Sequence, residues 1–82
     1  MTIEITNREV LIGWYRGQMA ESMEYLRMDQ EWISALNEFR EKYVHSWKII
    51  EACRELIFYY TKDIRDEVRE IEKLRAAINE LN

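Results

Sequence analysis

The 82-residue chain is long enough for one small domain, and sixteen acidic against twelve basic residues give it a net charge of −4. This acidic balance, without any block of basic residues, argues against binding to nucleic acid or to an anionic membrane surface. The longest apolar run, residues 56–60, is far shorter than the ~20 residues that a membrane span needs.

The chain has only one cysteine and one histidine, which leaves no pair of thiols for a disulfide and few ligands for a metal. We therefore expect no metal and no cofactor, and a cytoplasmic location, where a lone thiol stays reduced. A chain of this size buries only ~60% of its unfolded surface, so a single copy is marginally stable. Because the other remedies are missing, we expect the chain to bind itself as a dimer or small oligomer.

A first helix is predicted over residues 7–27, after an N-terminal arm over residues 1–6. Thr6 and the glutamate three residues after it have the spacing of a capping box, which is typical of a helix start. Asp29 could cap a second helix, because its carboxylate can accept hydrogen bonds from the first free N–H groups. This places the turn of a helical hairpin at residues 27–30.

The second helix is predicted over residues 30–81, because neither glycine nor proline interrupts this stretch. Five isoleucines recur in it at intervals of seven, and most positions three residues further on are apolar. This heptad pattern predicts a coiled-coil seam, and the same spacing reaches back to Tyr43 and Leu36. The residues expected at the oligomer interface are Ile50, Cys53, Ile57, Tyr60, Ile64, Ile71, Leu74, Ile78 and Leu81.

The two predicted helices differ greatly in length. They would be about 31 Å and about 78 Å long, so the first would cover the second only as far as Cys53. The remaining seam must then meet another chain, which predicts an all-α helical hairpin with a long coiled-coil-like second helix that forms oligomers. The alternative is a monomeric or dimeric three-helix bundle with a break at residues 61–63, where Thr61 or Asp63 could cap a third helix.

Two groups of residues are candidates for contact with another protein. Gly17 follows another glycine by one helical turn, and glycine within a helix costs about 1 kcal/mol, which suggests close approach by a partner. Between Tyr43 and Tyr60, apolar residues spread beyond the seam, as in a helix that is buried on most sides. The predicted partner-binding residues are Trp14, Gly17, Trp47, Phe58 and Tyr59.

No nucleophile–base pair, phosphate-binding glycine loop or metal-ligand cluster is recognisable, so we do not expect an enzyme. We expect a non-enzymatic helical protein that acts through protein–protein interaction, as a regulatory or inhibitor protein. Small acidic helical chains are frequent among viral (phage) and mobile-element accessory proteins, which is an association only. The alternative is an oligomer that binds or sequesters a nucleotide-like small molecule between aromatic and arginine side chains.

Overall fold

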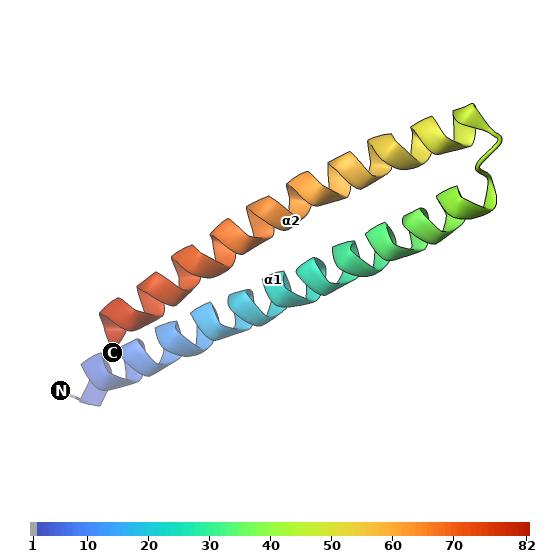
Figure 1. The fold of residues 1–82 in the computed structure, drawn as a ribbon. Coiled ribbons are helices and arrows are strands. Elements are labelled where there is room, and N and C mark those ends of the chain that lie inside the picture. The colour runs from blue at the N-terminus through green and yellow to red at the C-terminus, as the bar shows by residue number, and fades with distance from the viewer. Residues whose placement is uncertain (1) are drawn as a thin grey trace.

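The computed structural model describes the backbone of residues 2–82 and the side chains from Asn7 onward. This part of the chain forms two long helices, α1 (Thr2–Lys42) and α2 (Trp47–Leu81), joined by a short turn. The helices run side by side in opposite directions, so that both ends of the chain lie at the same end of the molecule (Figure 1). The prediction of an all-α helical hairpin is confirmed.

The turn lies at residues 43–46, so the predicted turn at residues 27–30 is wrong. Here the backbone N–H of Tyr43 donates to the carbonyl of Arg40 at 3.3 Å, and that of Ser46 donates to the carbonyl of Tyr43 at 3.0 Å. Ser46 has an extended backbone and its carbonyl accepts the first bond of α2, from the N–H of Ile50 at 3.0 Å. The chain therefore reverses through a short turn without glycine or proline.

The helix continues through residues 27–30 because the residues that face α2 keep their spacing there. They recur at alternating intervals of three and four, and every one of them is buried or half-buried. They are Ile12, Tyr15, Met19, Ser22, Leu26, Asp29, Ile33, Leu36 and Arg40. Asp29 thus belongs to the contact between the helices and does not cap a new one. After Arg40 this spacing ends, because residues 41–45 are all exposed. Half-buried residues at the seam begin again with Ser46.

Two other predicted boundaries are also corrected. Because α1 begins at Thr2, the predicted arm is helical from that residue, and Met1 lies outside the described residues. The alternative break at residues 61–63 is wrong, since α2 passes through it without interruption. The hydroxyl of Thr61 donates to the carbonyl of Ile57 at 2.7 Å, which satisfies this side chain inside a continuous helix.

The two helices are similar in length, so α1 covers the part of the isoleucine seam that was expected to have no partner within the chain. α1 has 41 residues and α2 has 35, which correspond to about 62 Å and about 53 Å. Within the single chain Cys53, Ile71, Leu74 and Ile78 are buried, and the other predicted interface residues are half-buried. The isoleucine ladder therefore packs in the hairpin itself, and its contact with another copy stays a prediction.

The molecule is a thin rod. Its Cα atoms extend over 68 × 14 × 13 Å, with a radius of gyration of 18.9 Å, whereas a compact chain of this length has about 12 Å. Among the described side chains only four apolar ones are buried, and none is less than 2% exposed. Two helices alone can bury one side of each other, so most of the surface of each helix stays open.

Candidate functional site

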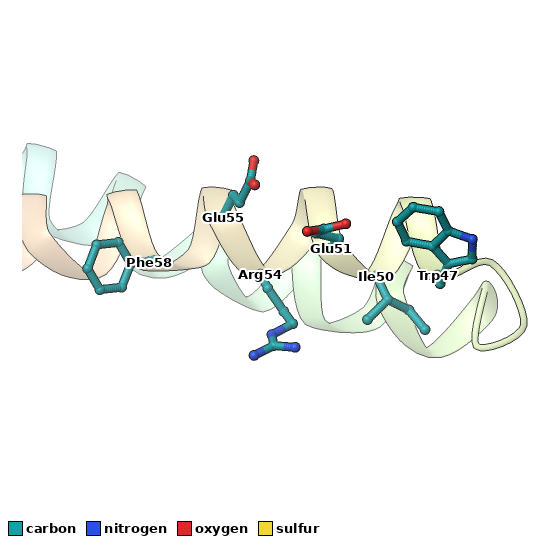
Figure 2. Close-up of a pocket in the computed structure, with 6 residues that line it drawn as sticks. All are labelled: Trp47, Ile50, Glu51, Arg54, Glu55 and Phe58. Carbon is teal, nitrogen blue, oxygen red and sulfur yellow. The ribbon is translucent and has the colours of Figure 1, made fainter.

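The outside of α2 carries a shallow groove next to the turn (Figure 2). Its volume is about 660 Å³. The residues that line it are spaced by three or four along the first turns of α2, which places them on one side of the helix. They are Trp47, Ile50, Glu51, Arg54, Glu55 and Phe58.

The two ends of this groove are its most exposed parts. Phe58 is 75% exposed and Trp47 is 68% exposed, the two highest values among the large apolar side chains that the structure describes. In Figure 2 Trp47 lies at the end of the groove beside the turn, and Phe58 lies at the other end. Because α1 packs on a different side of α2, it leaves both rings open to solvent.

The middle of the groove is charged. Arg54 extends to one edge and Glu55 to the opposite edge, with Glu51 between the two rings (Figure 2). Two carboxylates and one guanidinium leave the groove with a net negative charge, and none of the lining groups is a nucleophile paired with a base. Among the described residues, no group of three or more His, Cys, Asp and Glu is placed to hold a metal ion. The groove can bind through apolar contact and ion pairing.

A second exposed surface lies on the other side of the hairpin. Trp32 of α1 stacks on Tyr60 of α2, with ring centroids 6.3 Å apart and planes 8° apart. Tyr59 meets the edge of Tyr60, with centroids 5.7 Å apart. These contacts place Trp32 and Tyr59 on the same side of the molecule, and both remain more than half exposed.

Large apolar side chains continue along this side. On α1 they occupy positions spaced by three or four residues, with Gln18 and Glu21 at the two positions between Trp14 and Tyr25, which forms a second stripe beside the one that faces α2. We call the whole set the aromatic face. It comprises Leu11, Trp14, Tyr25, Met28, Trp32 and Phe39 from α1, with Leu56 and Tyr59 from α2, all between 39% and 59% exposed.

The opposite side of the hairpin, which we call the charged face, mixes charged and polar side chains with a few apolar ones. A smaller hollow of about 310 Å³ lies there between the two helices. It is lined by Met23, Leu26, Arg27, Gln30, Val68, Ile71, Glu72 and Arg75. Val68 follows Trp47 by three heptads, so the groove on α2 belongs to this charged side. The hairpin thus separates an aromatic face from a charged face.

Charged neighbours perturb several groups near these surfaces. The guanidinium of Arg27 donates to the carboxylates of Glu24 and Glu31; the bond to Glu24 lowers the pKa of that carboxyl and raises the pKa of Arg27. Such exposed pairs contribute little to stability. On the aromatic face the hydroxyl of Tyr25 donates to Glu21 Oε1 at 3.2 Å, and this bond raises the pKa of Tyr25.

The contact between the helices contains a buried acid. Asp29 is only 9% exposed. Burial raises the pKa of Asp29, and the nearby carboxylate of Asp63 on α2 raises it further. Both effects disfavour the charged form, because water is removed from it and a like charge lies across the seam.

The structure divides the predicted partner-binding residues between the two faces. Trp47 and Phe58 line the groove, whereas Trp14 and Tyr59 belong to the aromatic face. Gly17 is exposed, and a Cβ atom added there would meet no atom within 4 Å. No part of the described chain therefore approaches this glycine closely.

Sequence reasoning missed Tyr25, Trp32 and Phe39. They recur at intervals of seven residues, as does Leu11 two heptads before Tyr25. This signal was present in the sequence, but a turn placed at residues 27–30 divides the stripe between two helices. With α1 continuous, all four residues fall on one side of one helix.

Comparison with known proteins does not assign this chain to a group, since no family model, curated protein or solved structure matches it. Neither α1 nor α2, as far as the structure describes them, has a stretch both long and apolar enough to cross a membrane.

Proposed function

We propose that this chain is a non-enzymatic regulatory protein that binds another protein through the groove between Trp47 and Phe58. The observation that carries the proposal is the exposure of these two rings, 68% and 75%, on a helix whose other side packs against α1. Exposed tryptophan and phenylalanine side chains are costly in water and are frequent anchors of protein interfaces.

The lining of the groove indicates the chemistry of the partner. Apolar side chains of the partner would cover Trp47 and Phe58, and a lysine or arginine between them would face Glu51 and Glu55. An amphipathic helix or an extended segment with this pattern fits a shallow groove. The two carboxylates beside Arg54 would repel a phosphate, so the nucleotide-binding alternative has less support.

Site-specific photo-crosslinking in cells of the source organism tests the proposal. A photoreactive phenylalanine analogue at position 58 should form a covalent adduct with another protein. Trp47→Ala in the same chain should reduce the yield of this adduct at least tenfold, because the second anchor is lost. The matched control carries the analogue at position 10, since Val10 is equally open at 66% exposed but lies in α1 far along the rod. An adduct that forms equally from both positions, or from neither, would contradict the proposal.

A further inference from the structure

We infer that the aromatic face is the contact between two copies of this chain, which pair as hairpins into a four-helix assembly. This surface lies on the side of the hairpin opposite the groove and shares no residue with it. It also differs from the isoleucine ladder, most of which is already occupied by α1 of the same chain. The inference therefore concerns a surface and a partner that the proposed function does not use.

The accessible surface of the single chain is too large for a finished monomer. The chain has a mass of 10.1 kDa and exposes 6777 Å². A compact monomer of this mass exposes about 5,300 Å², so about 1,500 Å² is in excess. An excess of this kind is expected of one half of an assembly, because the other half buries part of its surface.

The aromatic face supplies the area that a stable dimer needs. Each of its five aromatic rings is about half exposed, which leaves roughly 75–125 Å² of each in contact with water. With the three aliphatic side chains the total is roughly 700 Å² per copy, or about 1,400 Å² for two copies. Specific interfaces bury about 1,200–2,000 Å² in total, so a contact between two such faces is of standard size.

A second copy fits this face because the face is self-complementary. On α1 its residues fall in two rows with a seven-residue repeat, which only Gln18 and Glu21 interrupt between Leu11 and Phe39 apart from the small Ala35. A seven-residue repeat is the spacing with which one helix packs against another, and an identical face presents the same spacing. The middle of the face is apolar on α1, around Met28 and Trp32, and on α2 the acid Asp63 is half-buried beside it, near Asp29. A two-fold axis there would bring apolar residues of both copies together.

Charges mark the limits of the contact. On α2 the positions of the aromatic face continue toward the C-terminus as three acids. They are Asp63, seven residues after Leu56, Asp66, seven residues after Tyr59, and Glu70, seven residues after Asp63. Full overlap of two hairpins would place apolar residues of one copy against these acids of the other. A contact made mainly by the α1 residues of the two faces, centred on Met28, leaves the acids of α2 at its edge in water, where their charge costs least.

Light scattering of the purified full chain, measured over a series of concentrations, tests the inference. The wild-type chain should have twice the 10.1 kDa mass of one copy. Trp32→Glu should raise the dissociation constant at least 100-fold, because it buries a charge at the centre of the contact. Met28→Glu should do the same, and it keeps the stacking of Trp32 on Tyr60 that the first substitution removes.

The matched control is Phe58→Glu, which changes an exposed aromatic residue on the charged face and should leave the dimer intact. Circular dichroism of each variant shows whether it remains helical, and the mass of a helical Met28→Glu chain decides the question if Trp32→Glu unfolds. A monomeric wild-type chain, a Met28→Glu chain that dimerises like the wild type, or a Phe58→Glu chain that becomes monomeric would each overturn the inference. None of these results depends on the adduct expected at position 58, so the two proposals fail separately.

Discussion

At the scale of single residues, Asp29 shows how a polar side chain can be misread. An aspartate followed by polar residues is typical of a helix N-terminus, but here it occupies a seam position in the middle of α1. Its carboxylate is buried near Asp63 of the other helix. The acid therefore opposes folding at neutral pH.

We predict that Asp29→Asn stabilises the protein near neutral pH by about 1 kcal/mol, or about 4–8 °C in melting temperature. The pKa of Asp29 is higher in the folded chain than in the unfolded chain, so the folded state holds the proton more tightly. The wild-type carboxyl is thus least unfavourable at low pH, and its cost appears as the pH rises through the folded pKa. The difference between variant and wild type should vanish below the unfolded pKa of ~3.9.

Thermal melts followed by circular dichroism across this pH range measure the difference. Asp66→Asn is the control, because Asp66 is an exposed acid on α2 and its replacement should change the melting temperature little. A destabilised Asp29→Asn chain, or a stabilisation that does not depend on pH, would be incompatible with the buried pair of acids.

At the scale of elements, the position of the turn depends on which of two overlapping patterns the chain uses. Leu36, Phe39, Tyr43, Ser46 and Ile50 follow one unbroken heptad phase, which predicts a continuous helix. In the structure Leu36 faces α2, whereas Phe39 and Tyr43 are 45% and 44% exposed, so this phase is not the one that packs. The turn falls where the α1 phase ends and the α2 phase begins.

Insertion of two glycines tests the position of the turn. Between Val44 and His45 the insertion only lengthens a loop, which should cost less than ~0.6 kcal/mol. Between Met28 and Asp29 it places glycine inside α1 and rotates the residues on either side by about 200° relative to each other. That should cost more than about 3 kcal/mol, because one half of the stripe then faces away from α2.

Urea unfolding followed by circular dichroism compares the two insertions directly. If the insertion at residues 28–29 were the one tolerated, the turn would lie where the sequence pattern first indicated and the observed hairpin would be wrong. Equal and small losses at both sites would show that the contact between α1 and α2 contributes little to stability.

At the scale of the whole molecule, only four of the apolar side chains that the structure describes are buried, so the rod has little core from which to gain stability. An aromatic face of about 700 Å² per copy would add apolar contact of the size of a specific interface. Folding and association would then be coupled, as in many small dimers.

We predict that the melting temperature of the wild-type chain rises by about 4 °C for each tenfold increase in protein concentration. The reason is mass action. One folded dimer unfolds to two separate chains, so the free energy of this unfolding rises by about 1.4 kcal/mol for each tenfold increase in concentration. Differential scanning calorimetry at several concentrations measures the effect. Met28→Glu should melt at a lower temperature that does not vary with concentration, and a wild-type melting temperature independent of concentration would argue for a stable monomer.

The candidate sites were predictable only in part. Trp47 and Phe58 stand out in the sequence because they are apolar residues off the seam, and the structure places them in one groove. The aromatic face was not predicted, because its residues come from both helices. Trp32 of α1 and Tyr59 of α2 lie on the same side only because both contact Tyr60 in the folded hairpin. Periodicity within a helix can assign a residue to a side of that helix, but it does not say which sides of two helices meet.

The sequence by itself determined that this chain is helical and that its isoleucine ladder packs against another helix. Both follow from local properties, namely the absence of glycine and proline from residues 30–81 and the seven-residue repeat. Only the tertiary structure decided where the chain reverses and that the ladder finds its partner within the same chain. The physical reason is that competing helical phases are nearly equal in local free energy, and the choice between them is made by the pairing of α1 with α2.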